Sequence, residues 1–136
     1  VRIRSDRRIL PVPMICTSPY PGFPTDMQSP LMAVLAYADG ISVIEENIFE
    51  ERLNCGAQLC RMGADIQITH NRARIIGQKE LKGAWVEAGD LRAGAALAVA
   101  AAGACGITKI ADPGHIRRGY EAIDQDLQML GGKVWW

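Results

Sequence analysis

The chain has 136 residues, and its 15 basic and 15 acidic residues give a formal net charge of zero. Hydrophobic residues make up 49% and charged residues 22%, which is ordinary for a globular chain with a real core. The even charge gives no support for nucleic acid or a membrane surface as a partner, because both usually need a basic excess. The longest apolar run, residues 93–107, is shorter than the roughly 20 residues that cross a bilayer. It predicts a buried helix running into a strand.

The first 24 residues predict extended structure. Residues 1–10 alternate and break at 6–8, which is typical of strand, turn and strand. The alternation begins without an initiator methionine, so we expect the sequence to be cut from a longer chain, and we see no signal peptide. Residues 9–17 predict a second extended piece. Residues 19–24 hold three prolines and a glycine, which predicts a stiff connector.

The apolar residues 31–38 predict a helix that ends near 39–40. Two starts fit the sequence. Thr25 and Gln28 have the spacing of a capping box, which would place Asp26 in the first helical turn. Alternatively, Ser29 is the N-cap and Pro30 takes the first helical position. Either start holds the carboxylate of Asp26 at the mouth of a helix.

The remainder of the first half predicts four elements. They are a short strand at 41–45, a charged loop at 46–52, a helix at 51–62 that stops at Gly63, and a hairpin that pairs 65–69 with 73–76 across 70–72.

The second half repeats the first at an offset that drifts from 64 to 68 residues. Four pairs of segments correspond: 26–28 with 90–92, 40–42 with 106–108, 51–52 with 117–118, and 62–66 with 130–134. We predict a tandem duplication of a strand–helix–strand–helix–strand unit, at about 9–77 and 78–136, with 1–8 as the tail of a preceding unit. Superposed copies would point equivalent helix N-termini the same way, and these ends suit a phosphate or a carboxylate.

The cysteines indicate neither disulfides nor a metal site. Cys16, Cys55, Cys60 and Cys105 include no Cys-x-x-Cys pair, and the two histidines complete no metal pattern. We expect four free thiols in a reducing cytoplasm, mostly packed as small hydrophobic side chains.

Five motifs in register carry a family resemblance. Residues 21–28 read Pro-Gly-Phe-Pro-Thr-Asp-Met-Gln, and four motifs follow: Phe-Glu-x-Arg at 49–52, Arg-Met-Gly-Ala at 61–64, Asp-Leu-Arg-Ala at 90–93, and His-Ile-x-Arg-Gly-Tyr-Glu at 115–121. Together they closely resemble the UDP-N-acetylglucosamine enolpyruvyl transferase family, over about residues 1–134. The resemblance implies the α/β fold of that family, an inside-out α/β barrel of six repeats in two domains. Residues 1–136 would form part of one domain and correspond to the last two repeats.

The resemblance also implies an activity. Members of the family transfer the enolpyruvyl group of phosphoenolpyruvate to the 3-hydroxyl of UDP-N-acetylglucosamine and release phosphate, which is the first committed step of peptidoglycan synthesis. The implied partners are these two substrates and the missing N-terminal part of the same enzyme. The implied location is the cytoplasm, and no cofactor is implied.

Two residues are the implied catalytic groups. A sugar hydroxyl is a poor nucleophile and needs a carboxylate within hydrogen-bond reach. By similarity that carboxylate is Asp26, as general base or as the group that orients the hydroxyl. Arg118 matches the family arginine that contacts phosphoenolpyruvate and follows it to the phosphate product. A cation at a predicted helix start is unfavourably placed, which itself suggests a function for Arg118.

The other implied site residues bind substrate. Arg52 and Arg92 match further arginines of the cleft, where they bind substrate or hold the cleft together by ion pairing. Asp90 is expected to pair with one of these arginines. Ile48 lies where the family uses a backbone group to hold the sugar, so its side chain should matter little.

Some features depart from the family pattern. The family's cysteine acid lies on a loop of the other domain, and no cysteine here matches its motif. A lysine that grips phosphoenolpyruvate is also missing. Arg117 replaces the usual aspartate, and Glu51 replaces the usual asparagine. We therefore expect the chain alone to be inactive. The alternatives are a sibling transferase acting on shikimate 3-phosphate and a non-catalytic binding or scaffold module.

Overall fold

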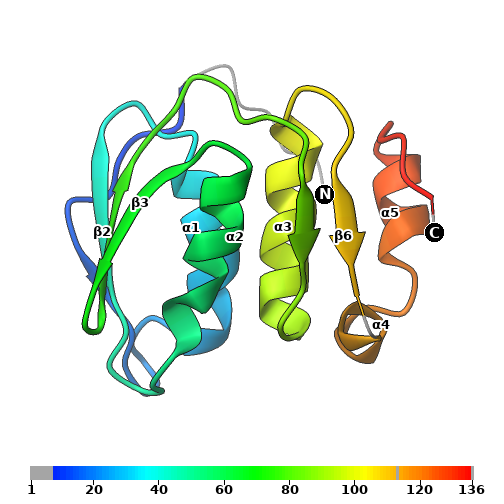
Figure 1. The fold of residues 1–136 in the computed structure, drawn as a ribbon. Helices are drawn as coiled ribbons and strands as arrows, with labels where there is room; N and C mark the ends of the chain where they lie inside the picture. The colour runs from blue at the N-terminus through cyan, green and yellow to red at the C-terminus, as the bar shows by residue number, and fades with distance from the viewer. Residues whose placement is uncertain (1–7, 113, 136) are drawn as a thin grey trace.

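The computed structural model describes residues 8–112 and 114–135, and it places three helices between two β-sheets (Figure 1). In chain order the elements are β1 (Ile15–Cys16), the 3-10 helix η1 (Thr25–Met27), α1 (Gln28–Leu35), β2 (Ile41–Glu45), the 3-10 helix η2 (Arg52–Asn54), α2 (Cys55–Arg61), β3 (Asp65–Thr69), β4 (Arg72–Ile76), β5 (Trp85–Glu87), α3 (Leu91–Gly103), β6 (Lys109–Ala111), α4 (His115–Gly119) and α5 (Ile123–Met129).

The larger sheet has the strand order β1-β2-β4-β3. Strands β1 and β2 are parallel, whereas β4 runs antiparallel to both β2 and β3. The second sheet is the parallel pair of β5 and β6. Helices α1, α2 and α3 lie between the two sheets, and α5 lies beyond β6 (Figure 1). The mixed α/β class is therefore the one expected.

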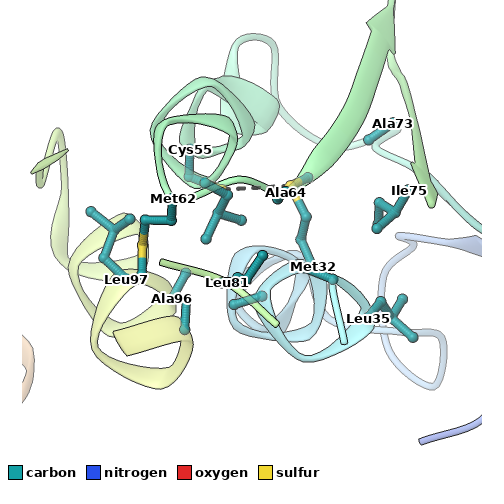
Figure 2. Packing of buried hydrophobic residues seen from close by; sticks show 14 of the residues in the cluster. Met32, Leu35, Cys55, Met62, Ala64, Ala73, Ile75, Leu81, Ala96 and Leu97 are labelled. Carbon is teal, nitrogen blue, oxygen red and sulfur yellow. Dashed lines mark hydrogen bonds between the residues drawn. The ribbon is translucent and has the colours of Figure 1, made fainter. Parts of the chain in front are cut away.

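The core forms where α1, α2 and α3 meet (Figure 2). Met32 of α1 and Leu97 of α3 are fully buried, and the thiol of Cys55 on α2 lies 3.8 Å from the sulfur of Met32. Small residues, among them Ala96 and Ala100 of α3, let the helices approach closely. The hydroxyl of Tyr37 adds a 2.6 Å hydrogen bond to the carbonyl of Ala100. This packing fixes how the N-terminal ends of the helices lie relative to one another.

The start of α1 matches neither predicted cap. The 3-10 turn η1 runs directly into α1 at Gln28, so Asp26 does lie in the first helical turn of this segment. The capping box does not form, because Thr25 is already inside η1 and its hydroxyl accepts from Arg52 and donates to Glu46. Ser29 is not the N-cap either, since it is already inside α1 and donates to the side-chain oxygen of Gln28. The helix ends at Leu35, earlier than predicted.

Other elements agree with their predictions more closely. The strand at 41–45 and the hairpin of β3 and β4 are confirmed, with His70 in the turn at a φ of 54°. The predicted helix at 51–62 is a 3-10 turn followed by α2. The predicted strand near the N-terminus falls on residues 1–7, outside the described residues, and 8–10 form no strand. The extended piece at 9–17 includes only the two-residue strand β1.

The duplication stays a prediction. Each half contains a parallel strand pair joined through a helix, β1-α1-β2 and β5-α3-β6. The halves differ afterwards, since the β3–β4 hairpin of the first has no counterpart strand at 130–134 in the second. Strand β6 begins at Lys109, after the segment 106–108 that corresponds in the predicted repeat to the start of β2.

Three further features concern the cysteines, the potential metal ligands and the lengths of the helices. All four cysteines are free, but only Cys55 is buried, so the expectation that most of them pack as hydrophobic side chains is wrong. In the part of the chain that the structure describes, no cluster of three potential metal ligands occurs. None of the described helices is long and apolar enough to span a membrane.

Candidate functional site

The N-terminal ends of three helices meet at one end of the molecule. The chain enters α1, α2 and α3 from the same end, which is the lower end in Figure 1. Asp26 and Arg52 lie in the 3-10 turns that lead into α1 and α2. Asp90 is the N-cap of α3, and Arg92 lies in its first turn. The predicted common direction of the Asp-led helices is therefore observed, and charged side chains from three distant parts of the sequence come together.

The carboxylate of Asp26 bridges two arginines. Nη1 of Arg52 donates to Oδ1 of Asp26 at 2.8 Å, and Nε of Arg92 donates to the same oxygen at 2.6 Å. The arginine side chains are 16% and 24% exposed, whereas that of Asp26 is 66% exposed. Oδ2 of Asp26 has no donor within residues 8–112 and 114–135. One carboxylate oxygen is thus held by two cations, and the other can accept a hydrogen bond from a ligand.

The arginines lower the pKa of Asp26. The hydrogen bond from Arg92 is the largest cause and that from Arg52 the next, and together they outweigh the upward effect of burial. A carboxyl whose pKa is lower in the folded state stabilises the fold above its unfolded-state pKa. That stabilisation disappears as the pH falls through the folded-state pKa.

We therefore expect acidification to narrow the stability gap between the natural chain and an Asp26→Asn variant. The natural chain should be the more stable one above about pH 4, and the difference should vanish as the pH falls further. Urea midpoints measured between pH 2 and 7 test this, with Asp65→Asn on exposed β3 as the matched control. A gap that is constant with pH, or one that widens in acid, would contradict it.

Arg52 is fixed by more than Asp26. Its guanidinium carbon lies 4.2 Å from the ring centroid of Phe49, a cation–π contact. Its Nη1 also donates to the hydroxyl of Thr25 at 3.2 Å. Neither Phe49 nor Thr25 was predicted as a site residue, although both belong to the quoted motifs.

A cleft of about 480 Å³ opens beside this charged cluster. It lies between the ends of α2 and α3, and its lining mixes both charges: Ser29, Phe49, Glu50, Glu51, Arg52, Asn54, Cys55, Gln58, Glu87, Gly89, Asp90, Arg92 and Ala93. Two of the predicted arginines thus line one concave, polar space.

Among the residues that the structure describes, no arginine side chain pairs with Asp90. Its Oδ1 accepts hydrogen bonds from the backbone N–H groups of Arg92 at 2.7 Å and Ala93 at 2.8 Å, which makes it the N-cap of α3. The expected ion pair is therefore wrong. Asp90 instead anchors the first turn of the helix that carries Arg92, so it acts on the site through the backbone.

Ile48 lies in the loop after β2, and its backbone N–H is already engaged. The N–H donates to Oε1 of Glu46 at 2.9 Å. No donor from the described part of the chain reaches its carbonyl oxygen, which leaves that group for a ligand. Ile48 does not line the cleft, although the neighbouring residue Phe49 does.

Arg118 lies elsewhere in its helix than predicted. It is in the last turn of α4, not at the helix start, because Oδ1 of Asp112 accepts from the N–H of His115 and begins the helix there. A cation is favoured at the C-terminal end of a helix, so the position of Arg118 in α4 is not unfavourable and does not itself suggest a function. The arginine is exposed, does not line the cleft, and pairs with no other described side chain.

The end of α4 nevertheless lies near the site. A Cβ added at Gly119 would be 3.1 Å from Cδ1 of Leu91, the first residue of α3. The last turn of α4, which carries Arg118, therefore packs beside the helix end that holds Arg92.

Comparison with known proteins identifies the fold family. Residues 2–127 match the family described as EPSP synthase (3-phosphoshikimate 1-carboxyvinyltransferase). The chain belongs to the EPSP synthase family.

Curated relatives within the EPSP synthase family confirm the resemblance that the motifs indicate. UDP-N-acetylglucosamine 1-carboxyvinyltransferase of Desulfofundulus thermocisternus is 50% identical over 135 residues, which cover 99% of this chain and 55% of the relative. The protein of the same name from Cellvibrio japonicus is 55% identical over 118 residues, 87% of this chain and 28% of the relative. The chain thus spans about half the length of the first relative and under a third of the length of the second.

Solved structures of EPSP synthase family members agree with the fold. The enolpyruvyl transferase NikO from Streptomyces tendae has a TM-score of 0.86 and 29% identity over 95% of this chain and 30% of its own. An EPSP synthase from Acinetobacter baumannii has a TM-score of 0.57 and 22% identity over 65% of this chain and 22% of its own, a likeness of fold alone. The α/β fold shared with enolpyruvyl transferases is therefore confirmed, whereas the barrel of repeats stays a prediction.

Glu51, where the family resemblance implies an asparagine, has a strained backbone conformation. Glu51 has a φ of 61° and precedes η2, so it occupies the left-handed region that asparagine tolerates better than glutamate. We expect Glu51→Asn to raise the free energy of unfolding by about 1 kcal/mol. Urea denaturation measures this, with Glu50→Asn, which has no positive φ, as the control. Equal effects of the two changes would show that the backbone strain is not the cause.

Proposed function

We propose that this chain is part of a cytoplasmic UDP-N-acetylglucosamine 1-carboxyvinyltransferase. The enzyme would transfer the enolpyruvyl group of phosphoenolpyruvate to the 3-hydroxyl of UDP-N-acetylglucosamine and release phosphate, the first committed step of peptidoglycan synthesis. The names of relatives at 50% and 55% identity support this assignment. Its partners would be the two substrates and the part of the same enzyme that corresponds to the residues of the relatives outside the match.

The bridging carboxylate of Asp26 carries the proposal. Arg52 and Arg92 hold one oxygen, and the other is open to a substrate hydroxyl. The low pKa of Asp26, due to Arg92 first and Arg52 second, makes it a weak base before substrate arrives. We therefore assign Asp26 to orienting the sugar hydroxyl in preference to removing its proton outright.

The arginines suit the other substrate. Phosphoenolpyruvate carries a phosphate and a carboxylate, and guanidinium groups bind both through charge-assisted hydrogen bonds. Arg52 and Arg92 are mostly buried beside a cleft, so they act in a less hydrated environment than surface arginines do. The side chain of Arg118 would extend from the end of α4 toward the same anion.

A chimaera tests the proposal. This chain would replace the matching segment of the Cellvibrio japonicus relative, and phosphate release would be measured with phosphoenolpyruvate and UDP-N-acetylglucosamine. We expect release that depends on both substrates. A chimaera that unfolds at the same temperature as the parent enzyme but releases no phosphate would support the scaffold alternative. The isolated chain should release none, because the cysteine acid and the lysine are absent.

Arg118 distinguishes an enzyme from a scaffold. In the chimaera, Arg118→Ala should lower kcat/KM for phosphoenolpyruvate by about 10²-fold, since one cation that stabilises the transferring group is lost. Its melting temperature should stay unchanged, because the side chain is exposed. Arg74→Ala, an exposed arginine of β4 outside the cleft, is the matched control. Equal kinetics of the two variants would remove Arg118 from the mechanism.

The sibling reaction on shikimate 3-phosphate remains the second candidate. The family description names that substrate, and an EPSP synthase shares the fold. The Pro-Gly-Phe-Pro-Thr-Asp-Met-Gln stretch at 21–28 and the names of the relatives favour the sugar nucleotide.

A further inference from the structure

A buried carboxylate lies behind the charged cluster. Glu46 follows β2 in a segment that the sequence predicts to be a charged loop, yet the residue is only 4% exposed. A buried charge is costly unless it is paired or fully hydrogen-bonded. No arginine or lysine side chain within the described residues pairs with Glu46, so hydrogen bonds must offset the cost.

Four hydrogen bonds converge on Glu46. Oε1 accepts from the hydroxyl of Thr17 at 2.9 Å and from the backbone N–H groups of Ile48 at 2.9 Å and Phe49 at 3.1 Å. Oε2 accepts from the hydroxyl of Thr25 at 2.8 Å. Burial raises the pKa of Glu46, but the four hydrogen bonds lower it by more, with the bond from Ile48 the largest of them. The net effect is a pKa below the usual range of a glutamate. The carboxylate is therefore held ionised in a closed set of donors.

One of these bonds, from Thr25, ties Glu46 to the substrate side. Thr25 precedes Asp26, and its hydroxyl accepts from Nη1 of Arg52 while it donates to Glu46. The same Nη1 binds Asp26. A short polar chain thus runs from Glu46 through Thr25 to the guanidinium that holds the orienting carboxylate.

The other bonds fix the backbone of the loop. The N–H groups of Ile48 and Phe49 both point at the carboxylate, and the hydroxyl of Thr17 accepts from the N–H of Asn47 at 2.8 Å. The N–H groups of three consecutive residues, Asn47, Ile48 and Phe49, are therefore oriented by the Glu46 carboxylate and by the Thr17 hydroxyl that donates to it. This leaves the carbonyl of Ile48 without a described donor and sets the ring of Phe49 beneath Arg52.

We infer that Glu46 is the positioning residue of the acceptor-sugar site, because it fixes both the loop backbone at Ile48 and the Thr25–Arg52 contact that orients Asp26. The inference rests on the proposed function. It concerns the sugar nucleotide first, because Glu46 reaches Arg52 only through the hydroxyl of Thr25, whereas Asp26 and Phe49 hold Arg52 independently of Glu46.

Steady-state kinetics of a Glu46→Gln chimaera test this role. Glutamine keeps the shape of the side chain but loses the charge and one acceptor oxygen. We expect KM for UDP-N-acetylglucosamine to rise about ten-fold, as charge-assisted hydrogen bonds weaken, while KM for phosphoenolpyruvate stays constant. Glu45→Gln is the neighbouring control, because Glu45 pairs with Arg72 and, within the described residues, makes no hydrogen bond to Thr25, Ile48 or Phe49. A merely structural role would lower kcat with both KM values unchanged.

Hydrogen exchange in the 136-residue chain gives a second readout. The amides of Ile48 and Phe49 should exchange slowly in the natural chain and much faster in Glu46→Gln, with the core of α3 unaffected. Unprotected amides in the natural chain, or equal rises of both KM values in the variant, would overturn the inference. A natural-sequence chimaera without sugar-dependent phosphate release would overturn the proposed function itself, and the role of Glu46 with it.

Discussion

Replacing Asp26 with asparagine should lower kcat of the chimaera by about 10²-fold or more while the protein stays folded. The asparagine oxygen can still accept from Arg52 and Arg92, as Oδ1 of the carboxylate does. The NH₂ group then replaces Oδ2, the oxygen open to substrate. An NH₂ group in that position can only donate, so it cannot accept a hydrogen bond from the substrate hydroxyl.

Asp65→Asn is the control for this experiment, since Asp65 lies on exposed β3 away from the cleft. Single-turnover measurements would separate binding from chemistry. If Asp26→Asn retained kcat within two-fold of the control, the open oxygen of Asp26 would have no role in the reaction, and the proposed assignment would be wrong.

A Gly77→Ala change should destabilise the fold by about 3 kcal/mol or more. Gly77 directly follows β4, and a Cβ there would lie 1.7 Å from the carbonyl oxygen of Ala38. Neither group can move easily, because the N–H of Gly77 donates to the carbonyl of Gly40 at 2.9 Å and Gln78 donates to Ala36 at 2.7 Å. The clash is therefore with backbone and not with a flexible side chain.

Gly89→Ala is the matched control, because no atom lies within 4 Å of its added Cβ and its φ is not positive. It should change the free energy of unfolding by less than about 0.5 kcal/mol. Urea or thermal denaturation compares the two variants. If Gly77→Ala unfolded at the same urea concentration as Gly89→Ala, the close approach of β4 to the end of α1 would be contradicted.

The parts of the fold with local signals could be predicted from the sequence. The β3–β4 hairpin alternates across a short turn, and Asp90 precedes an alanine-rich run that folds into α3 with Asp90 as its cap. The start of α1 could not be predicted in the same way. The hydroxyl of Thr25 donates to Glu46 and accepts from Arg52, so tertiary contacts occupy the group that the local capping box would need.

The site was predictable only in part, for similar reasons. Motifs and charge indicated Asp26, Arg52 and Arg92, which the structure brings together. Arg118 was expected at a helix start, but α4 begins at His115 with Gly114 as its N-cap, and the carboxylate of Asp112 accepts from the N–H of His115. Glu46 was missed because a run of acidic residues is usually solvated, and only the fold shows that this one is buried.

The most direct test of the central claim is competition between two acceptors in one reaction of the natural-sequence chimaera. UDP-N-acetylglucosamine and shikimate 3-phosphate would be supplied at equal concentration with limiting phosphoenolpyruvate, and mass spectrometry would identify the product. We predict that the enolpyruvyl ether forms on the sugar nucleotide, and that Asp26→Asn slows its formation by about 10²-fold or more. Enolpyruvyl transfer to shikimate 3-phosphate instead would contradict the account.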